Sequence, residues 1–154
     1  MYTSQHIFFG AIFSIFLFFL FPEMGWLMAI IIFASSVLID VDHYTYHVYK
    51  KKDWSLRNAY NWHIKNLKKF LSLPKKQREK VYGCVYALHG IEIVLLALLG
   101  SFLSKIFFFI AIGVSFHLIL DIVDATKYFD RLDKFSLIHD FLKFKKLKNI
   151  DDAL

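Results

Sequence analysis

Apolar residues gather into four blocks along the chain, and a turn or a polar stretch separates each block from the next. The blocks cover residues 7–21, 25–39, 81–99 and 102–123. A membrane-spanning helix needs about 20 mostly apolar residues to cross about 30 Å of hydrocarbon. The two earlier blocks reach that length only when their polar ends enter the membrane boundary. The pattern predicts an all-α fold, a polytopic membrane bundle of four transmembrane helices. The expected spans are about 5–21, 25–42, 78–99 and 102–124.

Composition supports a single membrane domain over residues 1–154. The hydrophobic fraction is 57%, above the roughly 45–50% of soluble domains. A secretory signal is the other interpretation of the first block, and it requires a basic leading segment and a small-residue cleavage site. Neither feature is present around residues 1–26, so we expect the first helix to remain in the protein. Cys84 stands alone, which excludes an intramolecular disulfide and a cysteine-based zinc site.

Basic residues predict how the spans are oriented. Of the 19 Lys and Arg residues, 11 fall between Lys50 and Lys80 and seven between Lys127 and Lys148. Basic loops stay on the cytoplasmic side of a membrane. We therefore expect a multi-pass protein of the inner (cytoplasmic) membrane, with both termini and the basic segments 44–77 and 127–154 inside.

Both basic segments carry apolar residues at helical spacing, which predicts amphipathic cytoplasmic helices. Such helices lie in the headgroup plane or pack on the cytoplasmic end of the bundle. Leu73-Pro74 should end the first of them, and Pro74 should open the third span. The apolar residues are Trp62, Leu67, Phe70 and Leu71 in the first segment and Phe129, Leu132, Phe135, Ile138 and Leu142 in the second. The net charge of +6 then favours membrane lipid as a partner, and a nucleic-acid partner is not favoured.

Ionisable residues occur inside or at the ends of all four predicted spans. Each costs at least about 2.5–3.5 kcal/mol at a helix centre, so such residues are rare and usually functional. They are His6 in the first span, Asp40, Asp42 and His43 in the second, His89 and Glu92 in the third, and His117 and Asp121 in the fourth. Given the orientation above, all of them lie toward the cytoplasmic face.

Imidazoles and carboxylates that project inward from several helices are how helix bundles build metal sites. Without a thiolate, the set suits zinc first, with manganese or iron as alternatives, and one or two ions. Each group also has a simpler interpretation. His6 could hydrogen-bond between helices, Asp40 and Asp42 could end a helix at the interface, and the two later His–carboxylate sets could be neutral pairs. His47, His63 and His139 are expected in solvent.

These motifs resemble the YdjM-like membrane-bound metal-dependent hydrolases, also described as LexA-binding inner-membrane hydrolases. The resemblance covers about residues 6–124. It is carried by His6, Asp40, Asp42, His43, His89, His117 and Asp121. It implies a divalent-metal site and a hydrolytic role similar to that of zinc-dependent phospholipase C relatives. Ile39 stands where the group has Pro, and residues 88–93 lack an Arg and a His of its third-span motif, which bears on substrate binding more than on the metal.

The function expected first is a membrane-embedded metal-dependent hydrolase acting on a lipid-like phosphoester at the cytoplasmic leaflet. Glu92 or Asp42 would be the catalytic general base, and the basic segments would hold the anionic headgroup. One alternative is a metal-ion or proton transporter, because intramembrane His and carboxylates also form ion relays. Another is a non-catalytic, metal-stabilised membrane protein. The substrate, the metal and the oligomeric state stay open.

Overall fold

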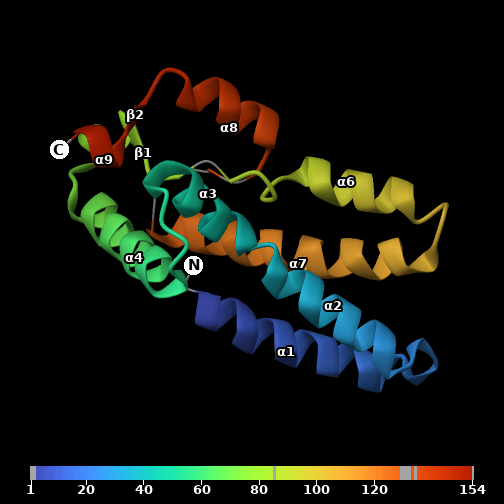
Figure 1. The fold of residues 1–154 in the computed structure, drawn as a ribbon. Helices are drawn as coiled ribbons and strands as arrows, with labels where there is room; N and C mark the ends of the chain where they lie inside the picture. Colours follow the sequence, from blue (N-terminus) through green and yellow to red (C-terminus); the bar gives the residue numbers. More distant parts are fainter. Residues whose placement is uncertain (1–2, 85, 129–132, 134, 154) are drawn as a thin grey trace.

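Two helical hairpins lie side by side and form a bundle, and a cluster of His and Asp side chains lies at one end of it. The structure, a computed structural model, describes residues 3–84, 86–128, 133 and 135–153. Helix α1 (Thr3–Leu20) turns through the 3-10 helix η1 (Pro22–Met24) into α2 (Trp26–Leu38), and α6 (Ile91–Gly100) turns into α7 (Lys105–Tyr128). Helix α2 contacts both α1 and α7, and α6 contacts α7 (Figure 1).

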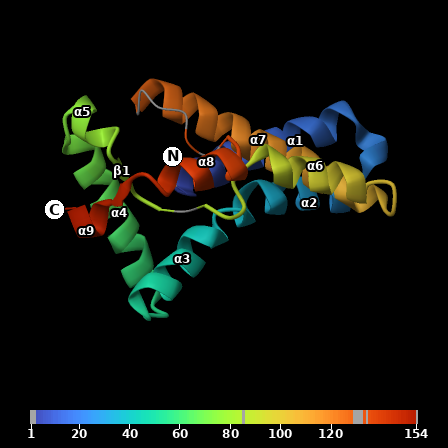
Figure 2. The same ribbon diagram turned by 90° about the horizontal axis from the view of Figure 1, so that it is seen from above.

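The remaining elements surround the end of the bundle at which α1 begins. They are α3 (Val41–Lys51), α4 (Leu56–Ser72), α5 (Lys75–Arg78), β1 (Val81–Tyr82), α8 (Leu137–Phe144), β2 (Lys148–Asn149) and α9 (Ile150–Ala153). Figure 2 shows α3 and α4 extending away from the bundle. Strands β1 and β2 form a short parallel pair, which the all-α prediction did not include.

Three helical stretches are long and apolar enough to cross a membrane: Thr3–Leu20, Trp26–Lys51 and Lys105–Lys127. They correspond to the first, second and fourth predicted spans. The second stretch bends where α2 ends at Leu38 and α3 begins at Val41, with Asp40 at the bend. Asp40 thus lies at a break in the helix, where its backbone N–H donates to the Val37 carbonyl at 3.2 Å, three residues back, in place of the regular bond to the residue four back.

The predicted third span at 78–99 is wrong in its first half, so four spans are not confirmed. Only α6, with 10 residues, is helical in its second half, and it is about 15 Å long. Residues 79–90 contain Gly83 and Gly90 together with β-branched and aromatic residues, all weak helix formers. Hydropathy alone cannot distinguish a buried extended segment from a buried helix.

The basic segments follow the predictions in part. Helix α4 ends at Ser72, because Leu73 adopts an extended conformation before Pro74. Pro74 then opens only the four-residue α5, not the long span expected. In the second segment, Ser136 caps the start of α8 through its side chain. Phe129 and Leu132 of the predicted tail helix lie outside the described residues.

Small residues let α2 approach α7 and α1 closely. A Cβ added at Gly113 of α7 would collide with the Ser35 hydroxyl and the Ile32 carbonyl of α2. A Cβ added at Gly10 of α1 would lie 2.5 Å from the Ser36 hydroxyl. Small residues at such contacts are typical of membrane helices, which associate largely by close packing. One turn beyond Gly113, this approach brings α7 within hydrogen-bonding reach of the α2 backbone.

The C-terminal segment is held to α3 and α4 through Asp151. Its carboxylate lies 2.9 Å from Lys51 Nζ and accepts a hydrogen bond from Trp62 Nε1 at 3.1 Å. Partial burial raises the pKa of Asp151, but the hydrogen bond and charge of Lys51 outweigh it, and the pKa lies below the ordinary value of 3.8. A carboxylate with a lowered folded-state pKa stabilises the fold above its unfolded pKa, and this contribution is lost as the pH falls through the folded pKa.

We therefore expect Asp151→Asn to lower the melting temperature at neutral pH. The difference from the wild type should shrink as the pH is taken below about 4. Thermal unfolding monitored by circular dichroism between neutral and acidic pH measures it. Glu23→Gln in the exposed η1 turn is the matched control. It should change neither the melting temperature at neutral pH nor the way the melting temperature depends on pH. A destabilisation by Asp151→Asn that is the same at every pH would contradict the ion-pair assignment.

Candidate metal centre

Five polar side chains from four separate parts of the chain meet at the end of the bundle where α1 begins. His6 comes from the second turn of α1, Asp40 from the α2–α3 bend, and His89 from the segment just before α6. His117 and Asp121 lie one turn apart on α7. The three imidazoles are each 1% exposed and Asp121 is 3% exposed. The predicted convergence of these residues is therefore a feature of the fold.

The backbone and a carboxylate set the orientation of two of these imidazoles. His117 Nδ1 lies 2.7 Å from the carbonyl oxygen of Ser36, which can only accept, so Nδ1 carries the proton. His89 Nδ1 lies 2.9 Å from Asp42 Oδ2 and donates to that carboxylate. A neutral imidazole protonated at Nδ1 presents a lone pair at Nε2. The two Nε2 atoms lie 3.0 Å apart, so two lone pairs face one another.

Carboxylate oxygens complete this arrangement. Asp40 Oδ1 lies 3.3 Å from His89 Nε2 and 3.7 Å from His117 Nε2. Asp121 Oδ2 lies 3.5 Å from both nitrogens. A tetrahedral site with bonds of about 2.0–2.2 Å separates its ligand atoms by about 3.3–3.6 Å. His89 Nε2, His117 Nε2 and Asp121 Oδ2 lie 3.0–3.5 Å apart and form one of the groups that could hold a metal ion, and Asp40 Oδ1 lies 3.3–3.7 Å from the same two nitrogens.

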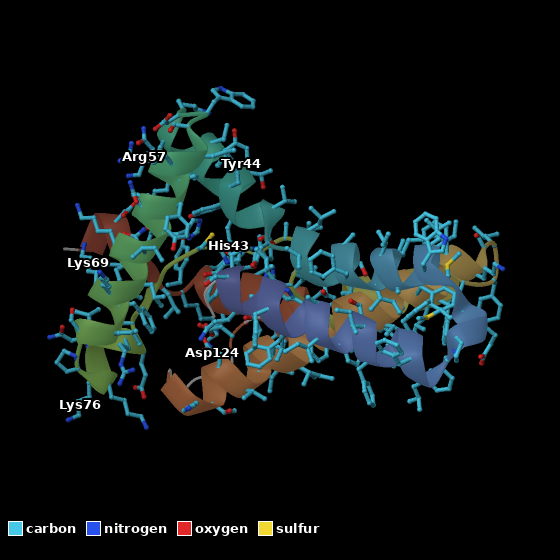
Figure 3. The ribbon with its side chains drawn as sticks, turned by 90° about the horizontal axis from the view of Figure 1, so that it is seen from below. His43, Tyr44, Arg57, Lys69, Lys76 and Asp124 are labelled. Atoms are coloured by element: carbon cyan, nitrogen blue, oxygen red, sulfur yellow. The ribbon has the colours of Figure 1, made fainter. Side chains whose placement is uncertain are left out.

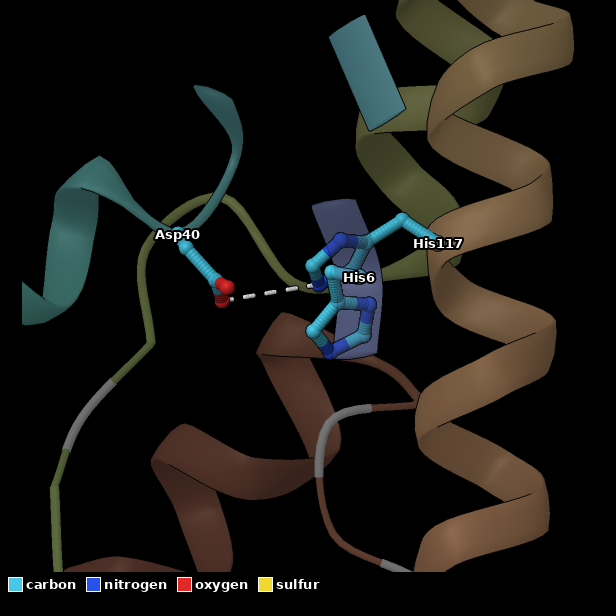
Figure 4. A group of neighbouring side chains, drawn as sticks. All are labelled: His6, Asp40 and His117. Atoms are coloured by element: carbon cyan, nitrogen blue, oxygen red, sulfur yellow. Dashed lines mark ion pairs between the residues drawn. The ribbon is translucent and has the colours of Figure 1, made fainter. Parts of the chain in front are cut away.

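His6 extends the cluster on the side of α1. Its ring stacks on His117 with a centroid distance of 3.9 Å, and its Nε2 lies 3.3 Å from Asp121 Oδ1. Among the described residues, neither ring nitrogen of His6 has a hydrogen-bond partner. Figure 4 shows Asp40 directed toward the His6 and His117 rings. His6, Asp40 and His117 form one of the groups that could hold a metal ion.

Asp42 and His43, also predicted as ligands, contact the cluster through His89 and Asp40. Asp42 Oδ2 accepts from His89 Nδ1 and from the Leu88 backbone N–H at 3.0 Å, while Asp42 Oδ1 lies 2.8 Å from His43 Nδ1. Asp42 therefore orients two histidines and satisfies the backbone of the non-helical segment. His43 is in a second group that could hold a metal, with Asp40 and His89, and its side chain is 20% exposed.

Glu92, predicted as a catalytic base, makes its contacts elsewhere. Its carboxylate accepts from the Ser136 hydroxyl at 2.6 Å, from Leu137 N at 2.9 Å and from Ile138 N at 3.3 Å. These donors are the N-cap residue Ser136 and the first two residues of α8, so Glu92 caps that helix from α6. Gly90 allows the close approach, because a Cβ there would lie 2.7 Å from Leu137 Cγ. The spacing to His89 suggested a shared site because the segment was expected to be helical.

We expect Glu92→Gln to reduce stability and to leave catalysis largely intact. Loss of a helix cap costs about 0.5–2 kcal/mol, whereas loss of a general base lowers turnover about 10²–10⁴-fold. Melting temperature and turnover of the metal-loaded protein separate the two effects. Glu79→Gln, outside the cluster, is the control. A loss of turnover in the general-base range without a change in melting temperature would restore Glu92 to the catalytic site.

A cavity of about 500 Å³ adjoins the cluster between α4 and the bundle. Asp40, His43 and Asp121 line it together with Asp124 and Asp133, and α4 contributes both apolar side chains, such as Leu67 and Phe70, and the polar His63 and Asn66. Figure 3 shows His43 and Asp124 on opposite sides of the space beside α4. Among the described lining residues there is no Lys or Arg. The predicted role of the basic segments in holding an anionic headgroup is therefore not a feature of this cavity.

Two histidines expected in solvent are placed differently. His47 is 3% exposed, with Nε2 3.7 Å from Asp53 Oδ2. His63 Nε2 lies 2.9 Å from the His43 carbonyl oxygen and helps to position that residue. His139 is exposed, as expected. Sequence reasoning also missed the Ser36 carbonyl, because a backbone acceptor has no signature in residue type.

The fold and the site together define a helical protein in whose described residues three helices are long and apolar enough to cross a membrane, and buried His and Asp groups could hold a metal ion. A scan of protein-family models finds no match to this chain, and searches of curated proteins and of solved structures find none either. The resemblance to the YdjM-like hydrolases therefore stays a prediction from the motif residues.

Proposed function

We propose that this chain is a membrane-embedded, metal-dependent hydrolase that cleaves a phosphoester at the cytoplasmic leaflet. One observation carries the proposal: the set of His89, His117 and Asp121 and the set of His6, Asp40 and His117 could each hold a metal ion, and they adjoin a cavity that Asp40 and Asp121 line. Zinc suits two imidazoles and two carboxylates in tetrahedral spacing. His6 would be a further ligand or would contact a second ion.

Electrostatics favour a cation at this point. Two carboxylates and two imidazole lone pairs converge in a buried volume, and like groups so placed repel unless positive charge lies between them. A bound divalent metal would supply that charge, lower the pKa of a water it holds toward about 7, and offset charge developing on a phosphoryl oxygen. Because no described Lys or Arg lines the cavity, an anionic substrate would depend on the metal for its attraction.

The chain offers a proton-transfer residue at the cavity wall. His43 lines the cavity, and its Nδ1 donates to Asp42 Oδ1 at 2.8 Å. The Asp42 carboxylate thus fixes the ring and favours proton uptake at Nε2, an arrangement typical of general acid–base catalysis. During hydrolysis the oxygen of water bonds to phosphorus and the ester P–O bond breaks. His43 Nε2 accepts the proton of the water and returns it to the leaving alcohol oxygen.

The test combines elemental analysis with turnover. Protein purified without chelator should hold about one or two equivalents of divalent metal and should hydrolyse a soluble chromogenic phosphomonoester or phosphodiester. His43→Gln should retain the metal and lose about 10²–10⁴-fold in turnover. The control, His139→Gln, alters an exposed histidine and should behave as the wild type.

Two outcomes would overturn the proposal. Protein without stoichiometric metal would remove its chemical basis and would favour a His–Asp hydrogen-bonding network. Metal-loaded, folded protein that hydrolyses neither phosphomonoesters nor phosphodiesters would favour a non-catalytic, metal-stabilised protein, and liposomes that then show metal or proton flux would favour a transporter.

A further inference from the structure

The cavity beside the cluster has both polar and apolar lining residues. Its polar lining includes the acids Asp40, Asp121, Asp124 and Asp133 together with His43. Along α4 the lining is mixed: Ala59 and Phe70, which are 4% and 6% exposed, occur together with His63 and Asn66 and with the apolar Ile64 and Leu67. A pocket of a few hundred Å³ with mainly apolar walls suits a ligand that is itself mostly apolar. This lining suits an amphiphile whose polar group lies at the cluster and whose chain lies along α4.

Among the exposed residues of the described lining, which form the rim of the cavity, Thr3 is polar and the others are aliphatic or aromatic. Leu38 and Val41, on either side of the α2–α3 bend, are 65% and 48% exposed, and Leu56 and Tyr60 of α4 are 70% and 57% exposed. All four also line the cavity. Leu38 and Val41 belong to the stretch that is long and apolar enough to cross a membrane. The rim is therefore continuous with a surface suited to lipid, whereas an entrance from water would be expected to carry polar side chains.

We propose that the substrate is a single-chain membrane amphiphile that enters the cavity sideways from the adjoining leaflet, between the α2–α3 bend and α4. Its hydrocarbon chain packs along α4, and its polar group stops at Asp40, His43 and Asp121. The identity of the reacting group rests on the proposed function, whereas the binding of the hydrocarbon chain in the cavity does not. A volume of about 500 Å³ is that of a site for one small ligand, which favours one chain over the two of a bilayer phospholipid.

A binding experiment tests the entrance without requiring turnover. The probe is an alkyl phosphate with one long chain and a terminal diazirine, incorporated in phosphatidylcholine vesicles that contain the full-length protein. Illumination should label α4 between Ala59 and Phe70, as read by peptide mass spectrometry. Leu56→Trp, which narrows the rim, should lower this labelling about tenfold, because excluding only two methylenes from an apolar wall costs about that factor. Leu20→Trp, at an equally lipid-suited position on the far end of α1, should not.

A kinetic experiment tests whether the substrate is a long-chain phosphoester. Leu56→Trp and Val41→Trp should lower kcat/KM about tenfold for a long-chain phosphoester in vesicles. Both should leave hydrolysis of a short, water-soluble phosphoester unchanged. Equal labelling of α4 in the wild type and Leu56→Trp, or equal loss on both substrates, would overturn the lateral entrance. Labelling of α4 without hydrolysis of either substrate would instead refute the proposed function and keep the amphiphile site.

Discussion

Replacing His117 by alanine is expected to remove the bound metal and to abolish turnover. His117 Nε2 lies within 3.0–3.7 Å of His89 Nε2, Asp40 Oδ1 and Asp121 Oδ2, so its loss removes one vertex of the proposed tetrahedron. Changing a residue that merely orients a ligand costs about 10–100-fold in metal affinity, and losing a ligand should cost more than that. Elemental analysis after dialysis and turnover at a fixed metal concentration measure both effects.

Thermal unfolding adds an independent measure of the same change. A metal bound at 100 times its dissociation constant stabilises the folded state by about 2.7 kcal/mol. Chelator should therefore lower the melting temperature of the wild type and leave that of His117→Ala unchanged. His139→Ala, an exposed histidine on α8, is the control and should respond to chelator as the wild type does. If His117→Ala retained full metal content, the cluster would not be the metal centre.

Asp42→Asn is expected to have the second-largest effect, although Asp42 does not belong to the tetrahedral set. The carboxylate accepts from three donors: His43 Nδ1, His89 Nδ1 and Leu88 N. An amide replaces one acceptor oxygen by a donating NH₂, so at least one of the two imidazoles must shift its proton to Nε2. For His89 that shift removes the lone pair needed by the metal, and for His43 it blocks proton uptake.

The readouts distinguish these two results of Asp42→Asn. Metal affinity should fall about 10–100-fold if His89 changes tautomer. Turnover of the metal-saturated protein should fall by at least about 100-fold if His43 does. Asp53→Asn, in the α3–α4 connection and 37% exposed at its side chain, is the control. Wild-type affinity together with wild-type turnover in Asp42→Asn would contradict the orienting role.

The sequence indicated which residues of the candidate site come together, but it indicated their arrangement only in part. His6, Asp40, His89, His117 and Asp121 stood out because ionisable groups are costly within apolar segments. Their shared depth followed from the alternation of spans and turns. The expectation that Glu92 lies beside His89 assumed that residues 88–92 are helical. In the structure the helix begins at Ile91, and the carboxylate turns toward the backbone of α8.

Local composition by itself determined the long apolar helices α1 and α7, the turn at Pro22 and the end of α4 before Pro74. Each of these depends on hydrophobicity or backbone sterics within a few residues. Only the tertiary structure decided that the described residues 79–84 and 86–90 lie outside a long helix, that Ser36 and Asp42 set the proton positions of His117 and His89, and that α4 lines a cavity. Those features depend on groups that are far apart in the chain and meet only after folding, where a buried donor must find whichever acceptor lies within reach.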